Sequence, residues 1–241
     1  MKMKNIEGQR IPETTFRTRE DGGWKDVSTH DIFAGKRVVV FALPGAFTPT
    51  CSSNHVPRYN ELAPALRARG IGDIVCISVN DAFVMDAWAK DQHADSVRFL
   101  PDGNGKFTAG MGMLVDKTDL GFGQRSWRYS MLVEDGVVKK MFIEPSVEGD
   151  PFEVSDADTM LKYLDPSAKT PPDILLIGRA GCSFCIKAKS MLKAHGLDYD
   201  EVEANPRRLR AASGRTTTPQ IFINGKHIGG ADELAAYLKQ L

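Results

Sequence analysis

Strand-like and helix-like runs alternate along this chain in two separate series. In the first series, apolar strand-like runs at residues 38–43 and 74–79 lie on either side of a helix-like run at 53–69. The order strand, helix, strand predicts a βαβ unit with a parallel sheet. The second series starts again with a strand-like run at residues 174–177. Because 241 residues exceed the usual domain size of about 100–200, the sequence predicts an α/β fold in two domains.

The first series contains further elements after the βαβ unit. In the helix at 53–69, the apolar side chains Val56, Tyr59, Leu62 and Leu66 recur at helical spacing and give one face to lay on the sheet. We expect another amphipathic helix at 82–93, a hairpin of strands 129–133 and 137–142, and a last helix at 155–164. The acidic-glycine turn at 134–136 favours the hairpin.

A proline-rich stretch separates the two series. Residues 165–172 contain Pro166, Pro171 and Pro172 and have no apolar periodicity, which is typical of a semi-rigid linker. We therefore divide the chain into domains 1–165 and 173–241, joined by a linker at 166–172. In the second domain the sequence predicts these elements: strand 174–177, helix 183–195, strand 199–202, helix 207–212, a hairpin at 220–228 that turns at Asn-Gly, and helix 232–241.

Composition excludes several classes of protein. The 31 basic residues balance 31 acidic ones, which gives no support to binding of nucleic acid or of a membrane surface. Four cysteines are too few for the disulfide framework of a small secreted domain, so reduced thiols are expected. The polar first ten residues lack the apolar core of a secretory signal. We expect a cytoplasmic protein.

Cys51 lies where the first buried strand gives way to the following helix. Unpaired backbone N–H groups and the helix dipole favour a thiolate at such a place. Position alone also allows a buried cysteine that packs as a small apolar side chain. Likewise Pro44 and Thr48, taken singly, are explained equally well by a turn and a helix cap.

Taken together, residues 44–51 resemble the peroxiredoxin signature, in which a proline, a threonine and a cysteine follow at spacings of four and three. The resemblance covers about residues 1–165 and is closest to the atypical peroxiredoxin-five class. It implies a thioredoxin-like fold and a peroxide-reducing Cys51. Pro44 would shield the cysteine from water, the Thr48 hydroxyl would contact the thiolate and the peroxide, and Arg128 would supply positive charge.

The remaining residues of this domain leave the source of electrons open. Cys76 lies in the middle of a predicted strand, which predicts a buried and inert thiol. His55, one helical turn after Cys51, is either a helper of the cysteine or a packing residue. Some members of the class resolve the oxidised cysteine with a second, carboxy-terminal cysteine, and the domain has none besides Cys76. The electrons must therefore come from elsewhere.

Cys182 and Cys185 are separated by two residues at the start of a predicted helix. This spacing suits a thiolate that forms a disulfide with its neighbour, or half of a zinc site. Zinc would need two more ligands at comparable spacing, and the domain offers only the scattered His195 and His227. The sequence therefore favours a dithiol redox centre.

Residues 173–241 resemble glutaredoxin in three ordered motifs: 178–185 around the two cysteines, Thr217-Thr218-Pro219, and 229–232. The resemblance implies a cis peptide bond before Pro219. It also implies these glutathione-binding residues: Arg179, Phe184, Arg215, Thr218, Pro219, Gly230, Ala231 and Asp232. One departure is Ser183, which stands where a proline is usual. Glutaredoxins with this serine are among those suspected of holding an iron–sulfur cluster.

Together the two halves resemble the bacterial hybrid peroxiredoxin–glutaredoxin proteins. The resemblance implies a peroxidase for hydrogen peroxide and alkyl hydroperoxides, with glutathione as co-substrate, no tightly bound cofactor and no metal. A homo-oligomer is also expected from the resemblance. Two alternatives are a second domain that binds a glutathione-ligated iron–sulfur cluster or senses redox state, and a deglutathionylating enzyme in which Cys51 is a sensor.

Overall fold

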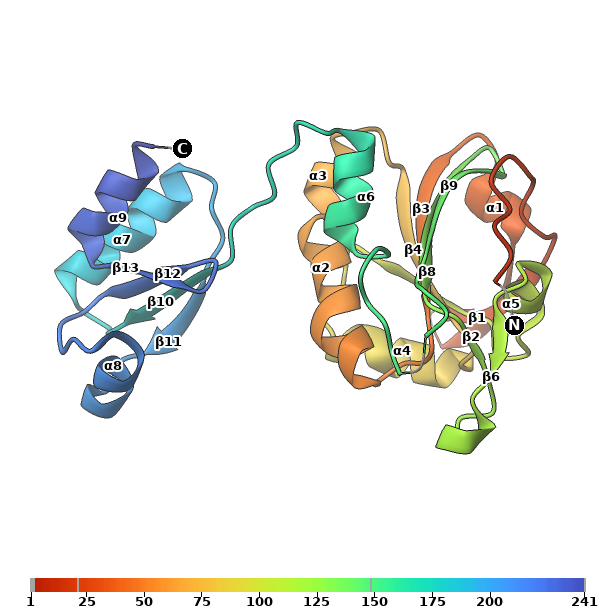
Figure 1. Cartoon of the computed structure of the whole chain (residues 1–241), viewed down its shortest axis with the longest axis horizontal. Coiled ribbons are helices and arrows are strands. Elements are labelled where there is room, and N and C mark those ends of the chain that lie inside the picture. Colours follow the sequence, from red (N-terminus) through yellow and green to blue (C-terminus); the bar gives the residue numbers. More distant parts are fainter. Residues whose placement is uncertain (1–2, 21, 148, 241) are drawn as a thin grey trace. The chain divides into compact units, whose positions relative to one another are not determined.

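The computed structural model describes residues 3–20, 22–147 and 149–240. The chain forms two compact units, Met1–Ala168 and Lys169–Leu241, each with its own sheet and helices (Figure 1). Residues 169–173 form neither helix nor strand. In the described part of the chain, no helix is both long enough and apolar enough to cross a membrane.

The first unit is built on a five-stranded sheet of order β5-β4-β3-β8-β9. Its strands are β3 (Arg37–Leu43), β4 (Asp73–Ser78), β5 (Arg98–Pro101), β8 (Tyr129–Glu134) and β9 (Val137–Ile143). Strands β3, β4 and β5 are parallel, which confirms the predicted βαβ unit. Strands β8 and β9 form the predicted antiparallel hairpin. Its turn residues Asp135 and Gly136 both have positive φ angles, 47° and 74°, as a tight hairpin turn requires.

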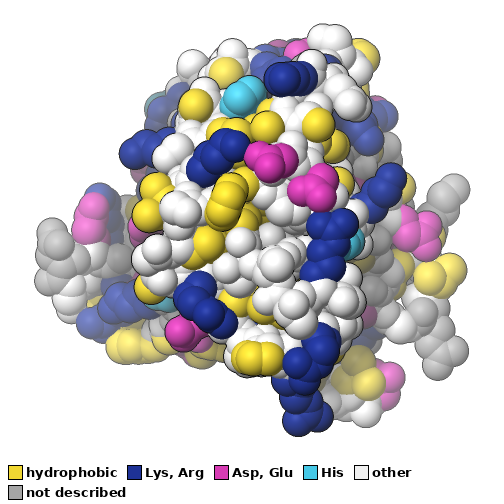
Figure 2. Space-filling model, turned by 90° about the vertical axis from the view of Figure 1, so that its left-hand side faces the viewer, with side chains coloured by type: hydrophobic (Ala, Val, Ile, Leu, Met, Phe, Trp, Pro, Cys, Tyr) yellow, Lys and Arg dark blue, Asp and Glu magenta, His cyan; other side chains and the backbone are white. Residues whose placement is uncertain are grey.

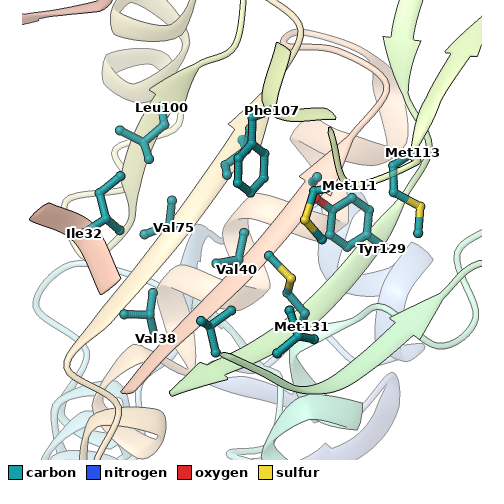
Figure 3. Packing of buried hydrophobic residues seen from close by; sticks show 14 of the residues in the cluster. Ile32, Val38, Val40, Val75, Leu100, Phe107, Met111, Met113, Tyr129 and Met131 are labelled. Atoms are coloured by element: carbon teal, nitrogen blue, oxygen red, sulfur yellow. The ribbon is translucent and has the colours of Figure 1, made fainter. Parts of the chain in front are cut away.

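Both faces of this sheet are covered, as Figure 1 shows. One face is covered by α2 (Val56–Glu61), α3 (Ala63–Arg67), α4 (Ala82–Asp91) and α6 (Ala157–Leu164). The other is covered by α1 (Thr29–Phe33) and α5 (Lys106–Gly110). A strand that is buried on both faces of a sheet has apolar residues at every position. In β3, successive side chains point alternately into the core on one face and the core on the other. Val38 and Val40 pack into the core of Figure 3, while Val39 and Phe41 pack under α2.

The segment after β3 differs from the single helix predicted at 53–69. A π-helical turn, Cys51–His55, leads into α2, and α3 follows after Leu62. Pro57 and Pro64 lie in the first turns of α2 and α3. Proline has no N–H to donate to the preceding turn, so it is tolerated at a helix start but interrupts a helix interior. The two prolines therefore divide the predicted helix into shorter pieces.

Several short elements of the first unit are absent from the sequence-based prediction. They are the hairpin β1 (Thr15–Glu20) and β2 (Gly23–Ser28), helices α1 and α5, strand β5, and the hairpin β6 (Leu114–Asp116) and β7 (Gln124–Ser126) with the 3-10 turn Thr118–Leu120 between them. In β1 and β2 only Phe16 and Val27 are buried. A strand with one buried residue has too little apolar alternation to be recognised.

The second unit has a four-stranded sheet of order β11-β10-β12-β13. Its strands are β10 (Ile174–Gly178), β11 (Asp200–Glu203), β12 (Gln220–Ile223) and β13 (Lys226–Gly229), and its helices are α7 (Ser183–Ala194), α8 (Pro206–Ser213) and α9 (Ala231–Leu238). Every element predicted here is present. The last helix ends at Leu238, before the predicted end at residue 241, which lies outside the described residues.

The helices of the second unit cover both faces of its sheet. Helices α7 and α9 pack on one face through Leu192 and Leu234, and α8 packs on the other through Leu209 (Figure 1). On the surface shown in Figure 2, Lys and Arg side chains are scattered among hydrophobic and acidic ones and form no single basic field. This agrees with the balanced charge of the sequence.

Candidate active sites

Cys51 is the first residue of the π-helical turn that follows β3 and the loop 44–50. Its side chain has no exposed surface and packs with the residues under α2. The helical backbone begins just before it, because the N–H of Ser52 already donates to the carbonyl of Thr48 at 3.0 Å. The structure thus places the thiol in the first turn of a helix, as predicted.

Arg128 lies directly against this thiol. It precedes β8, and β8 pairs with β3, so the sheet brings residue 128 beside the end of the strand that leads to Cys51. Nη1 of Arg128 donates to Sγ of Cys51 at 3.4 Å, and the side chain is only 1% exposed. Burial lowers the pKa of Arg128, but the sulfur of Cys51 and the carboxylate of Asp150 outweigh it, and the pKa is raised overall. The guanidinium therefore keeps its charge.

His55 is part of the same cluster, and its contacts fit both roles that the sequence left open, because it contacts Arg128 and its ring also packs against that of Phe41. Its Nδ1 lies 3.1 Å from Nη1 of Arg128, and its Nε2 lies 3.1 Å from the carbonyl oxygen of Ser155. A carbonyl only accepts, so Nε2 carries the proton and Nδ1 accepts from Arg128. Burial, and then the charge of Arg128, hold the pKa of His55 well below its ordinary value of 6.5. The ring is neutral and helps to orient the guanidinium.

A small cavity of about 150 Å³ adjoins this cluster at Arg128, while Cys51 and His55 are not among the residues that line it. Pro44, Thr48 and Arg128 line it, so the structure brings together the residues that the sequence predicted around Cys51. The rest of its lining is mainly apolar: Pro49, Leu120, Phe122, Trp127 and Pro151, with Lys117, Gly149 and Asp150. The hydroxyl of Thr48 donates to the carbonyl of Gly45 at 2.8 Å. A larger hollow of about 660 Å³ is lined by none of the predicted site residues.

The sequence analysis missed the segment 149–155, which contributes several contacts to the cluster. Asp150 forms an ion pair with Nη2 of Arg128. The ring of Phe152 lies 4.9 Å from that of His55 and 5.5 Å from the guanidinium carbon of Arg128. These residues follow no helical or strand periodicity, so only their contacts in the folded chain identify them.

Cys182 forms the centre of the second site. It is the N-cap of α7, and its sulfur accepts the N–H of Cys185 at 3.3 Å. The hydroxyl of Thr218 donates to the same sulfur at 3.5 Å. Hydrogen bonds from Cys185 first, and then from Thr218, lower the pKa of Cys182 to about 7. A large fraction of Cys182 is therefore thiolate at neutral pH.

Cys185 has the opposite character. It is 1% exposed, and burial raises the pKa of its thiol. Cys182, in contrast, is partly exposed. The two thiols thus divide into an accessible nucleophile and a protected neighbour, as in the dithiol centre that the sequence predicted.

A groove of about 480 Å³ lies beside Cys182. The Thr218–Pro219 peptide bond is cis, which confirms the prediction. All the residues predicted to bind glutathione line this groove: Arg179, Phe184, Arg215, Thr218, Pro219, Gly230, Ala231 and Asp232. Two ion pairs missed by the sequence analysis hold its rim, Arg215 with Glu233 at 3.1 Å and Lys187 with Asp232 at 2.9 Å.

The other candidate residues, Cys76, His195 and His227, line neither the cavity at Arg128 nor the groove beside Cys182. Cys76 has no exposed surface in β4, and burial raises the pKa of its thiol well above the ordinary value. His195 contacts the carbonyl of Met191, and His227 contacts the side chain of Gln220. Within the described ranges, no three His, Cys, Asp or Glu side chains gather in a way that could hold a metal ion.

Comparison with known proteins agrees with this division into two sites. Residues 6–161 match the Redoxin family and residues 174–228 match the Glutaredoxin family. The chain is 58% identical over 239 residues to a protein named hybrid peroxiredoxin from Haemophilus influenzae, covering 98% of this chain and 99% of the relative. It is 57% identical over 169 residues to a peroxiredoxin of Synechocystis, covering 65% of this chain and 89% of that one.

Among solved structures, reduced Prx3 from Vibrio vulnificus in complex with hydrogen peroxide is similar to the first unit. The TM-score is 0.64 at 42% identity, with 67% of this chain and all of that chain covered. The fold, the arrangement around Cys51 and the dithiol centre at Cys182 agree with these matches. The chain therefore belongs to the Redoxin family as a hybrid peroxiredoxin, in which a thioredoxin-like peroxiredoxin domain is followed by a glutaredoxin domain.

Proposed function

We propose that this peroxiredoxin uses glutathione as its reductant and that its own glutaredoxin domain delivers the electrons to Cys51. One contrast carries the proposal. Besides Cys51, the described part of the first unit contains only Cys76, which is buried in a strand with a raised pKa. Cys182 is accessible, has a pKa of about 7 and lies beside a groove of suitable size for a tripeptide.

The oxidative half-reaction takes place at Cys51. The thiolate sulfur attacks the terminal oxygen of a hydroperoxide, an S–O bond forms and the O–O bond breaks. The sulfur loses two electrons and becomes sulfenic acid, and the leaving oxygen takes a proton and departs as water or an alcohol. The Arg128 guanidinium, 3.4 Å from the sulfur, stabilises the negative charge that moves toward the leaving oxygen. The mainly apolar cavity suits alkyl hydroperoxides as well as hydrogen peroxide.

The reductive half-reaction returns the electrons in three steps. A glutathione thiol condenses with the sulfenic acid, so that an S–S bond forms and water leaves. The Cys182 thiolate then attacks the glutathione sulfur of this mixed disulfide and releases the Cys51 thiolate. A second glutathione attacks the glutathionylated Cys182 and leaves as glutathione disulfide. Per cycle, one hydroperoxide and two glutathione molecules give one alcohol or water, one further water and one disulfide.

The residues that line the groove beside Cys182 offer charges and hydrogen bonds that suit glutathione. Arg179 and Arg215 carry positive charge that suits the carboxylates of glutathione, and Asp232 carries negative charge that suits its amino group. The backbone of Thr218, before the cis Pro219, offers hydrogen bonds to the peptide. Fusion by a short linker raises the effective concentration of the glutaredoxin to about millimolar.

The test follows oxidation of glutathione in the presence of hydrogen peroxide, coupled to glutathione reductase and NADPH. We expect Cys51→Ser to abolish turnover and Cys182→Ser to reduce it strongly. The matched control is Cys76→Ser, which should retain full activity. Full peroxidase activity in Cys51→Ser would overturn the assignment of the peroxide-reducing cysteine. Unchanged turnover in Cys182→Ser would overturn the relay within the chain.

A further inference from the structure

Asn80 follows the carboxyl end of β4 and lies against the loop 44–50. Strands β3 and β4 are parallel, with Leu43 beside Ser78, so the segments that follow them begin at the same edge of the sheet. Oδ1 of Asn80 accepts the N–H of Ala46 at 3.0 Å and the hydroxyl of Ser78 at 2.7 Å. Because a backbone N–H only donates, the oxygen of the Asn80 amide, and not its nitrogen, faces the loop.

Asn80 is itself held in place by its neighbours. The side chain of Ser78, which has no exposed surface, donates to Oδ1 and fixes the plane of the amide. Nη1 of Arg125 donates to the carbonyl of Val79 at 2.6 Å, and its Nε donates to the carbonyl of Phe122 at 3.0 Å. Both the side chain of Asn80 and the peptide before it are therefore anchored.

The N–H that Asn80 binds belongs to the peptide between Gly45 and Ala46. The carbonyl of this same peptide accepts the hydroxyl of Thr48 at 2.8 Å. A peptide unit is planar, so turning its N–H away from Asn80 would also turn its carbonyl away from Thr48. A Cβ atom built at Gly45 would lie 3.4 Å from Cγ2 of Thr48 and 3.8 Å from Oδ1 of Asn80, so both side chains pack directly against this peptide.

The backbone of the loop needs these hydrogen bonds, because Phe47 within it has a φ angle of 61°. This left-handed conformation costs a residue other than glycine about 1 kcal/mol or more. The side chain of Phe47 is 52% exposed, so burial of the ring offsets little of that cost. The hydrogen bonds of Ala46 and Thr48, on either side of Phe47, help to hold the loop in this shape.

The bond to Gly45 decides what Thr48 offers to a substrate. A hydroxyl has one proton to donate and two lone pairs that accept, and the proton of Thr48 is used on the Gly45 carbonyl. Toward the cavity that it lines together with Arg128, Thr48 is therefore an acceptor. An alkyl hydroperoxide carries its one O–H on the terminal oxygen, which is the oxygen that Cys51 attacks. An acceptor at Thr48 holds that oxygen and leaves the other one to the guanidinium of Arg128.

We propose that Asn80 is a positioning residue for the oxidation of Cys51 and that it acts through the hydroxyl of Thr48. By holding the peptide before Ala46, Asn80 keeps that hydroxyl turned as an acceptor toward the peroxide. Without Asn80 the peptide turns, and the Thr48 proton points into the cavity, where it meets the O–H of the hydroperoxide. The inference rests on the oxidation step of the proposed function and is independent of the reduction by glutathione.

The test measures oxidation of Cys51 by hydrogen peroxide in full-length Asn80→Leu, by rapid mixing, acid quench and mass spectrometry. Leucine keeps the branched shape of the side chain and lacks the acceptor. We expect oxidation to be about tenfold slower, as loss of one hydrogen bond in the transition state would give. The matched control is Asn60→Leu. Oδ1 of Asn60 also accepts a backbone N–H at 3.0 Å, that of Ser96, and Asn60 does not line the cavity, so this variant should react like wild type.

A double-mutant cycle with Thr48 separates positioning from a general effect on the fold. Thr48→Ser keeps the hydroxyl, so Asn80→Leu should slow this variant about tenfold as well. Thr48→Val has no hydroxyl to orient, so adding Asn80→Leu should change its rate by less than about twofold. Equal slowing in the serine and valine backgrounds would overturn the inference, because Asn80 would then act on the loop as a whole.

Ser78→Ala keeps the test decisive if Asn80→Leu folds poorly. It removes only the hydroxyl that fixes Oδ1 of Asn80, and it should slow oxidation about threefold in the wild-type background and not in Thr48→Val. A wild-type rate in Asn80→Leu, or in Ser78→Ala where Asn80→Leu does not fold, would overturn the inference. Failure of wild-type Cys51 to react with hydrogen peroxide would instead overturn the proposed function, and this inference with it.

Discussion

Replacing Arg128 with methionine removes the positive charge that faces the Cys51 sulfur. Nη1 lies 3.4 Å from Sγ. Two unit charges at that separation attract by about 5 kcal/mol at an effective dielectric constant of about 20. A tenfold change in rate corresponds to about 1.4 kcal/mol. If half of this attraction is realised only in the transition state, where the negative charge spreads toward the leaving oxygen, Arg128→Met should slow the reaction with peroxide about fiftyfold.

Rapid mixing with hydrogen peroxide measures this rate directly. Trp127 lines the same cavity as Arg128 and is 6% exposed, so its fluorescence should report oxidation of Cys51. Methionine fills most of the volume of arginine, and the Asp150 carboxylate that it leaves without its partner is 41% exposed, so water can solvate it. The control Arg17→Met removes an exposed charge paired with Asp26 and should react like wild type. A loss of less than about threefold, with an unchanged urea midpoint, would refute the charge argument.

Other predictions concern the second site and the pH dependence of stability. Thr218→Val removes a hydroxyl donor to the Cys182 sulfur and should raise the pKa of Cys182 above about 7. The pH profile of its alkylation rate should then shift to higher pH, and an unchanged profile would show that Thr218 does not lower this pKa. At neutral pH, one equivalent of iodoacetamide should label Cys182 before Cys185, because burial raises the pKa of Cys185. Peptide mass spectrometry measures the order, and labelling of Cys185 first would contradict this prediction. His55 is buried and neutral with a lowered pKa, so below pH 6.5 the unfolded chain binds a proton that the folded chain does not. The free energy of unfolding should therefore fall as the pH drops from about 6.5 to 5, before carboxylates titrate, and His55→Phe should flatten this slope; a parallel slope in the variant would contradict it.

The chemistry-bearing residues could be predicted because they lie in short motifs or at strand ends. Cys51 and Thr48 belong to one contiguous segment, and Arg128 was assigned from the resemblance to peroxiredoxins, directly before a recognisable strand. Cys182 was predicted from its two-residue spacing to Cys185 at the start of a helix and from the resemblance to glutaredoxin, and in the structure the backbone N–H of Cys185 donates to its sulfur. In each case a local pattern fixes the position of the side chain.

The parts that escaped prediction depend on contacts between distant segments. Glu144 and Ser155 meet through a loop without periodicity, and only the folded chain sets their hydrogen bonds against His55. The π-helical turn was missed for a related reason. Its hydrogen bond runs from the N–H of Val56 to the carbonyl of Cys51, one residue further along the chain than in an α-helix. The spacing of apolar side chains does not predict such a turn.

The most direct test of the relay uses Cys182→Ser, oxidised with one equivalent of peroxide and then mixed with glutathione. The account predicts that Cys51 accumulates as a mixed disulfide with glutathione, which intact mass and peptide mapping would detect. Adding excess glutathione should release it slowly, whereas in wild type the adduct should pass to Cys182 and disappear quickly. If no adduct forms on Cys51, or if it is released equally fast in both proteins, electrons do not reach Cys51 through Cys182.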